Sequence, residues 1–241
     1  MTEHISRKEL KHDKIRESFE HGAEAVYSHS QVVGILVAVV LAVVIAYAGW
    51  KFYSDRQTLQ ASAALDDAMK TYNARVGLRN PSADAADLSF PTEEARSQAS
   101  LLKFTAAADK YSRTSPGRLA RYYEALALED LERHNQALEE LKKLASSSDK
   151  ELAAMAQYQT ANIYARTGKI DDAVKTYRAL AELHSVFVPR QVVLLELADL
   201  LRSSNPAEAS NLYQQIKKEF PDNSAVTDRA DRGLGMMAPK S

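Results

Sequence analysis

Adjacent acidic residues are the first side chains of this sequence that could do chemistry, because carboxylates can ligate a metal ion. Such pairs stand at residues 66–67, 129–130, 139–140 and 171–172. Neighbouring helix residues point about 100° apart, so the two carboxylates of a pair cannot converge on one ion. Four histidines near the N-terminus recur every eight or nine residues, whereas helical ligand pairs stand about one turn apart. We interpret the acids as solvated helix faces and predict no metal site.

The sequence also lacks the signatures of catalysis and of cofactor binding. It has no cysteine, which excludes a cysteine nucleophile, thiolate zinc sites and disulfides. None of the motifs G-x-x-x-x-G-K-[ST], G-x-G-x-x-G, H-E-x-x-H and G-x-S-x-G occurs. Lysine and arginine total 31 against 32 acids, so no basic excess attracts nucleic-acid phosphates. We predict a protein that is not an enzyme and has no cofactor, small-molecule substrate or nucleic-acid partner.

An uncharged segment near the N-terminus predicts a transmembrane helix over residues 31–53. Residues 32–50 read VVGILVAVVLAVVIAYAGW, nineteen residues without a charge. At about 1.5 Å per residue this length nearly spans a hydrocarbon core of about 30 Å. Aromatic rings and a lysine of the kind found at membrane interfaces flank the segment. These residues are Tyr27, Tyr47, Trp50, Lys51, Phe52 and Tyr53.

A cleaved signal peptide is the main alternative for this segment. Ala46-Tyr47-Ala48 resembles a cleavage site, and residues 32–45 have the length of a signal core. The thirty residues before it hold six acids, which is longer and more acidic than a usual signal start. We therefore favour an uncleaved anchor over a soluble, signal-cleaved periplasmic protein. A buried core helix fits less well, because no other segment of the chain is as apolar.

Charge does not settle the orientation of this helix. Five Lys/Arg residues precede it, and five lie in residues 51–80, so the positive-inside count is a tie. A short polar tail before a single early helix most often stays in the cytoplasm, which places the following domain on the other side. We expect a charged, partly helical tail (1–30), the membrane helix, a helical repeat domain (54–235) interrupted by a loop at 77–91, and a disordered C-terminal tail (236–241).

A repeat of 36 residues follows the loop. Alanines recur at positions 137, 173 and 209, with Leu141, Tyr177 and Tyr213 four residues after them. A fixed period on this scale indicates an α-solenoid, in which a small alanine lets two helices approach closely. We predict an all-α fold of about four helical hairpins. The residues assigned to packing between helices are Ala125, Ala137, Ala161, Tyr164, Gly168, Ala173, Tyr177, Ala198, Ala209 and Tyr213.

Residues 161–180, ANIYARTGKIDDAVKTYRAL, resemble a tetratricopeptide repeat, with its turn glycine and spaced small and aromatic residues. The resemblance implies a concave groove that binds a protein partner. Positions that face this groove in the family correspond here to Tyr122, Leu126, Glu129, Tyr158, Asn162, Ala165, Leu195, Asp199 and Arg202. Tyr122 and Tyr158 are the strongest candidates, because tyrosine gives a large amphipathic contact at low entropic cost. The alternative is that both rings pack between repeats.

The junction after the apolar segment resembles the ancillary SecYEG translocon subunits of YfgM type, a bacterial family. There Gly49-Trp50 leads through Lys51, Phe52 and Tyr53 into a helix rich in small residues, Gln-Ala-Ser-Ala-Ala at positions 60–64. The resemblance implies an inner-membrane protein with a cytoplasmic N-terminus and a periplasmic repeat domain. It also implies partners among the SecYEG translocon and periplasmic chaperones. The long charged tail and the 77–91 loop depart from the family and put the partner's identity in doubt.

Overall fold

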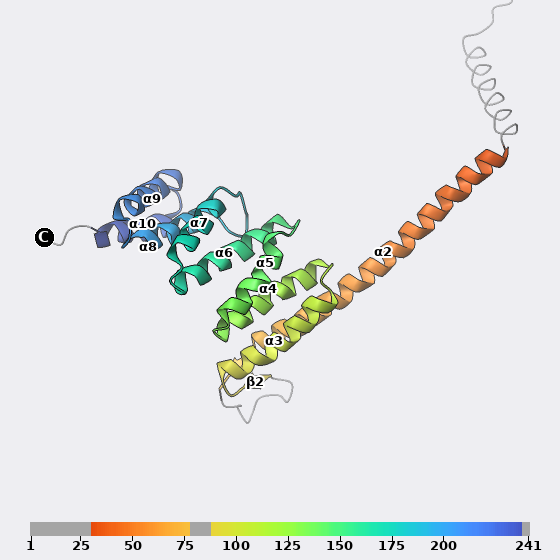
Figure 1. Ribbon diagram of the computed structural model, residues 1–241, viewed down its shortest axis with the longest axis horizontal. Coiled ribbons are helices and arrows are strands. Elements are labelled where there is room, and N and C mark those ends of the chain that lie inside the picture. The colour runs from red at the N-terminus through yellow and green to blue at the C-terminus, as the bar shows by residue number, and fades with distance from the viewer. Residues whose placement is uncertain (1–29, 78–87, 238–241) are drawn as a thin grey trace, which may run out of the picture. The chain divides into compact units, whose positions relative to one another are not determined.

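The computed structural model describes residues 30–77 and 88–237. These described residues divide into two compact units, one up to Arg56 and one from Gln57 onward. The predicted tail before residue 30 and the membrane-interface candidate Tyr27 lie outside the described residues. The predicted all-α architecture is confirmed: apart from two very short strands, the described elements are helices (Figure 1).

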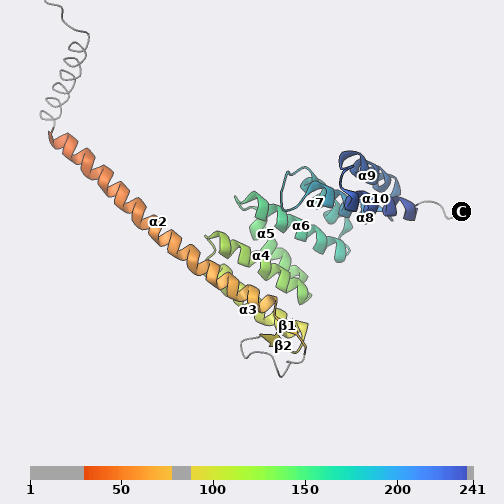
Figure 2. The same cartoon turned by 180° about the vertical axis from the view of Figure 1, so that it is seen from behind.

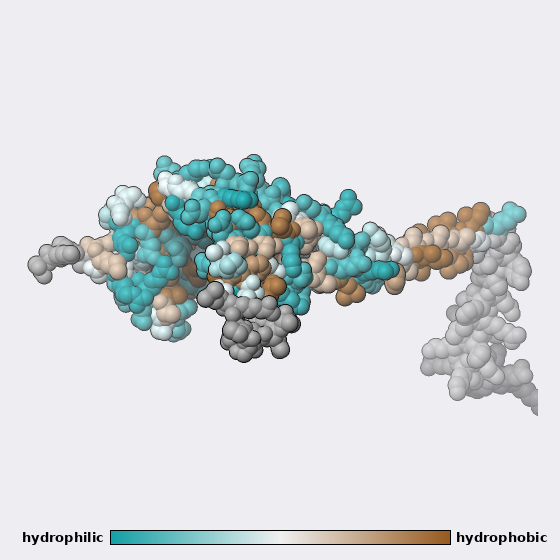
Figure 3. Space-filling view, turned by 90° about the horizontal axis from the view of Figure 1, so that it is seen from below, coloured by the Kyte–Doolittle hydropathy of each residue, from teal (hydrophilic) through white to brown (hydrophobic). Residues whose placement is uncertain are grey.

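Helix α2 (Ser30–Tyr72) carries the apolar segment and contributes to both units. In the first unit, every side chain that the structure describes between residues 31 and 53 is exposed, and Figure 3 shows the resulting apolar surface. Within the described residues, α2 is the helix that is long and apolar enough to cross a membrane. The helix does not end where the predicted span ends, at residue 53, but continues into the repeat unit.

Two short strands follow α2 at the base of the predicted loop. Strands β1 (Arg75–Val76) and β2 (Ser89–Phe90) pair in parallel (Figure 2). Gly77 leaves β1 with a φ of 125°, a backbone conformation that favours glycine. The strand pair therefore joins the two ends of the 77–91 loop, whose interior lies outside the described residues.

Eight further helices make up the rest of the repeat unit within the described residues. They are α3 (Glu93–Lys110), α4 (Ser115–Asp130), α5 (His134–Ala145), α6 (Lys150–Arg166), α7 (Ile170–Ala181), α8 (Arg190–Leu201), α9 (Pro206–Glu219) and α10 (Ser224–Met237). Residues 57–72 of α2 pair with α3, and α4/α5, α6/α7 and α8/α9 form three more hairpins, in agreement with the prediction of about four. Helix α10 packs on α8 and α9 as an additional closing helix. It includes Met236 and Met237, which the sequence had placed in a disordered tail, while residues 238–241 lie outside the described residues.

Local sequence explains where these helices begin. The side chains of Thr92, Thr114, Asp149 and Asn205 each accept a hydrogen bond from a free amide in the first turn of the helix that follows. Proline occupies the start of α4 and α9, where its missing N–H costs nothing. Helices α5, α7 and α8 start without a side-chain cap.

Small residues set the spacing within and between hairpins. Six alanines, one from each helix of α4 to α9, have no exposed surface: Ala125, Ala137, Ala161, Ala173, Ala198 and Ala209. Tyr177 and Tyr213 are among the largest fully buried side chains, and Tyr164 packs partly buried against the same core. The 36-residue period of the sequence is thus the period at which helices touch.

The turns within hairpins differ in how they reverse the chain. Gly168, between α6 and α7, has a φ of 76°, in the left-handed region that glycine tolerates. The α4–α5 turn has no glycine, and Glu132 adopts the same conformation with a φ of 57°. A residue with a β-carbon is strained there.

Candidate partner-binding groove

The first helices of three successive hairpins, α4, α6 and α8, line a hollow of about 400 Å³. We call this hollow the groove. Its lining comes mainly from the middle and the C-terminal turn of α6, with one residue each from α4, α7 and α8. The lining residues are Glu129, Gln159, Asn162, Ala165, Arg166, Tyr177 and Glu196.

A chain of hydrogen bonds fixes the floor of the groove. Tyr177 donates its hydroxyl to Asn162 Oδ1 at 2.5 Å, and Asn162 Nδ2 donates to Gln159 Oε1 at 3.1 Å. Gln159 Nε2 in turn donates to the Tyr122 hydroxyl at 3.3 Å. Each amide is thereby held in one orientation. The NH₂ group of Gln159 uses one of its two hydrogens in this chain, whereas Asn162 also hydrogen-bonds the Tyr158 hydroxyl.

Glu129 joins three helices at one end of the groove. Its Oε1 lies 2.8 Å from Nδ1 of His134, the first residue of α5, and its Oε2 pairs with Arg166 at the end of α6. The Glu129 side chain is only 9% exposed, so its carboxylate is largely desolvated. This carboxylate holds the second and third hairpins in register.

Helix α10 contacts the groove residue Glu196 at the other end. Arg229 of α10 donates to Asp199 Oδ2 through Nη2 at 2.6 Å and to Glu196 Oε1 at 3.0 Å. The hydroxyl of Tyr213 donates to the other oxygen of Asp199. Arg202 donates to the sulfur of Met236, also in α10, at 3.0 Å. Asp199 and Arg202 therefore bind α10 and α9 rather than stand free.

The two tyrosines proposed as anchors have different environments. Tyr122 is 7% exposed, and burial raises the pKa of its hydroxyl. Its ring meets that of Tyr123 edge to face, with centroids 5.6 Å apart. Tyr158 is half-buried, and its ring lies edge-on to that of Tyr177 at 6.2 Å. Burial also raises the pKa of Tyr158. Tyr122 thus packs between repeats and reaches the groove through its hydroxyl, whereas Tyr158 keeps part of its ring accessible.

Residues 27–185 match the tetratricopeptide repeat-like domain. The chain belongs to this family. A second match, to the tetratricopeptide repeat, covers residues 192–223, which hold α8 and α9. Nothing among the curated proteins or the solved structures matches the chain. Because tetratricopeptide repeats are protein-interaction modules, the repeat unit is a scaffold for protein partners.

The structure brings together some of the tetratricopeptide positions named from the sequence and separates others. Glu129, Asn162 and Ala165 line the groove, while Leu126 is partly buried beside it in the core of the second hairpin. Leu195 is 3% exposed and packs in the core. The sequence analysis missed Gln159, Arg166 and Glu196. Each of them follows a named position by one residue, so a helix face about 100° wider would have included all three.

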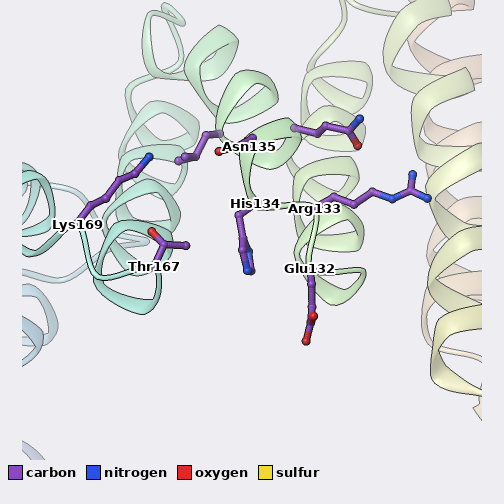
Figure 4. A pocket seen from close by; sticks show the side chains of 8 residues that line it. Glu132, Arg133, His134, Asn135, Thr167 and Lys169 are labelled. Carbon is purple, nitrogen blue, oxygen red and sulfur yellow. The ribbon is translucent and has the colours of Figure 1, made fainter.

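A second hollow, of about 530 Å³, lies between the α4–α5 and α6–α7 turns of the tetratricopeptide unit (Figure 4). Its lining is mostly polar and charged: Glu132, Arg133, His134, Asn135, Gln136, Leu138, Thr167 and Lys169. The side chain of Arg133 points away from those of Glu132 and His134, so these groups do not converge on a common centre. Within the described residues, no cluster of His, Asp and Glu could hold a metal ion.

Proposed function

We propose that this protein is a membrane-anchored interaction scaffold that assists protein secretion or envelope protein assembly beside the translocon and periplasmic chaperones. Helix α2 would anchor it in the bacterial inner membrane, with the N-terminus in the cytoplasm and the repeats in the periplasm. The observation that carries the proposal is the continuity of α2, whose apolar first part is exposed and whose last part builds the first hairpin.

The extent of the family match supports the anchor. The match begins at residue 27, ahead of the apolar segment, and runs through the first three hairpins. The apolar helix is therefore part of the pattern that the family shares. The junction at Gly49-Trp50, which resembles YfgM-type subunits, lies within the same continuous helix.

The groove supports a peptide or partner helix as the bound element. Its lining offers an oriented amide donor from Gln159 beside the Tyr177 side chain, with Glu129 and Arg166 at one end. Oriented polar groups beside an aromatic surface suit a polypeptide, whose backbone supplies acceptors at regular spacing. No comparable set of converging groups in the described residues suits a catalytic reaction.

The anchor is tested by extracting membranes at alkaline pH and measuring the intact mass of the protein. An anchored protein stays in the membrane fraction and retains residues 1–48. A protein that is washed off and begins after Ala48 would instead be the signal-cleaved, soluble periplasmic protein that acts on envelope or division machinery.

The partner is tested by co-purification from solubilised membranes. Ala165→Arg fills the groove with a long charged side chain, whereas Gln214→Arg makes the same change on the exposed surface of α9. Translocon subunits or periplasmic chaperones should co-purify with the wild type and with Gln214→Arg, and be lost with Ala165→Arg. Equal recovery with both variants, at equal melting temperature, would reject the groove as the binding site.

A further inference from the structure

The loop between α7 and α8, residues 182–189, exposes two large apolar side chains. Val186 is 77% exposed and Phe187 is 68% exposed, beside Leu183 at 42%. Neighbouring exposed apolar side chains on a folded domain form a candidate contact site. The concave groove does not account for it, because none of these residues lines the groove.

Glu151 of α6 holds this loop in one conformation. Its Oε2 accepts a hydrogen bond from the Ser185 hydroxyl at 2.6 Å and from the amides of Val186 and Phe187 at 3.0 and 3.1 Å. These bonds lower the pKa of Glu151. The amide of Val188 donates to Ser185 Oγ at 3.0 Å, and the Val188 side chain is buried. The loop is thus anchored on both sides of its tip, and the two apolar side chains are presented outward at little entropic cost.

The loop belongs to one edge of the hairpin stack, which we call the loop edge. Successive helices run antiparallel, so the turns that follow the second helix of each hairpin, at 111–114, 146–149, 182–189 and 220–223, lie on this edge. The repeat unit also begins at this edge, at Gln57. Asp67 pairs with Lys103 and Tyr72 lies beside Arg96, which shows that α2 runs antiparallel to α3. The chain therefore enters the repeat unit through the loop edge.

The loop edge also carries a row of exposed basic residues, with the exposed acids Asp109, Glu182, Glu219 and Asp222 among them. Every second helix of a hairpin ends with cationic residues in its last turn, and all of them are exposed: Lys110, Lys142, Lys143, Arg178, Lys217 and Lys218. Lys142 and Lys218 make no ion pair within the described residues. The charges thus extend over four hairpins, on both sides of the apolar tip, instead of gathering around it.

We propose that the loop edge rests on an anionic lipid bilayer, with Val186 and Phe187 inserted among the headgroups and the lysines facing anionic lipids. This inference rests on the proposed function, since α2 must hold the repeat unit at a membrane. An apolar tip combined with basic residues along the same edge is the pattern of interfacial membrane binding. Two side chains alone bind weakly, but a tether to the same bilayer raises their effective concentration. A row of charges spread over four hairpins fits a broad charged surface better than the pocket of a single protein.

The absence of cysteine allows a direct test in the full-length protein. A fluorophore is attached at Val186→Cys, which leaves Phe187 in place, and at Ser204→Cys as the control. Ser204 is exposed in the α8–α9 turn, on the opposite edge of the stack. The proteins are reconstituted in phosphatidylcholine vesicles with about one third phosphatidylglycerol and with a spin-labelled lipid as quencher. We expect about a twofold loss of fluorescence at position 186 and none at position 204. The loss should be smaller in vesicles of pure phosphatidylcholine and in the Lys142→Gln/Lys218→Gln variant.

Three results would overturn this proposal and differ in what else they reject. Equal fluorescence at both positions, in protein that resists alkaline extraction, would reject the lipid contact and leave the anchor intact. Protein that does not stay with the vesicles would reject the anchor, and the lipid contact with it. Protection of position 186 in native membranes but not in lipid vesicles would assign the loop to a protein partner.

Discussion

At the scale of single residues, Tyr122 shows how packing and binding share one side chain. Its ring is buried among the second and third hairpins, while its hydroxyl begins the hydrogen-bond chain of the groove floor. We expect Tyr122→Ala to lower the free energy of unfolding by about 3 kcal/mol, since it leaves a cavity. Tyr122→Phe should cost about 1 kcal/mol or less, because it removes only one hydrogen bond. Chemical denaturation followed by circular dichroism measures both values, and equal losses would show that the ring is not core.

The two left-handed turn residues provide a matched pair of substitutions. A β-carbon at Gly168 meets nothing within 4 Å, so Gly168→Ala isolates the backbone strain and should cost about 1 kcal/mol. Glu132→Gly relieves the same strain in the α4–α5 turn and should raise stability by roughly 0.5 kcal/mol. The gain is smaller than the strain relieved, because glycine also raises the conformational entropy of the unfolded chain. Thermal melts show whether Gly168→Ala is less stable and Glu132→Gly more stable than the wild type. A loss of stability in Glu132→Gly would mean that the Glu132 side chain has a role beyond the turn.

At the scale of elements, Ala173 tests the spacing of the best-matching repeat. It has no exposed surface in the middle of the α6–α7 packing, so Ala173→Leu should overpack the contact and cost about 1 to 3 kcal/mol. Lys175→Leu adds a leucine to the exposed side of the same helix and should leave the melting temperature nearly unchanged. An unchanged melting temperature in both variants would contradict the repeat register.

The buried carboxylate of Glu124, on α4, makes the stability of the fold depend on pH. Glu124 is 6% exposed; its Oε1 accepts from the Thr105 hydroxyl at 2.8 Å, and its Oε2 has no hydrogen-bond partner. Burial raises the pKa of Glu124 above the ordinary 4.5, and the Thr105 bond partly opposes this. Between the two pKa values the folded state holds a proton that the unfolded state has lost, so the contribution of Glu124 to stability rises as pH falls.

We therefore expect Glu124→Gln to be more stable than the wild type at neutral pH, and the difference to shrink as pH falls toward 5. Glu139→Gln, an exposed neighbour on α5, should show no such change. Melting temperatures across this pH range decide the matter. A variant that is less stable at neutral pH would show that the ion pair with Arg121, at 3.7 Å, outweighs the cost of burial.

The sequence predicts the elements better than it predicts the groove. The 36-residue alanine period locates the helices, because close helix packing requires small residues at fixed spacing. It does not reveal Glu132 in a left-handed turn, since the hairpin geometry imposes that conformation on an unsuited residue. Nor does it reveal the closing role of α10, whose Arg229 reaches Asp199 across 30 positions of the chain. Asp199 is an exposed groove residue in the sequence pattern and an ion-pair partner in the folded chain.

At the scale of the whole molecule, one continuous helix connects the exposed apolar segment to the repeat stack, and this continuity underlies both proposals. The direct test places a photo-crosslinking residue at Ala165 in the groove and, as a control, at Gln214 on α9, and irradiates intact membranes. Mass spectrometry then identifies the captured chains together with the protein's own N-terminus. The account predicts translocon or chaperone adducts from position 165 but not from 214, on a chain that retains residues 1–48. Equal capture from both positions, or capture on a chain that begins after Ala48, would contradict it.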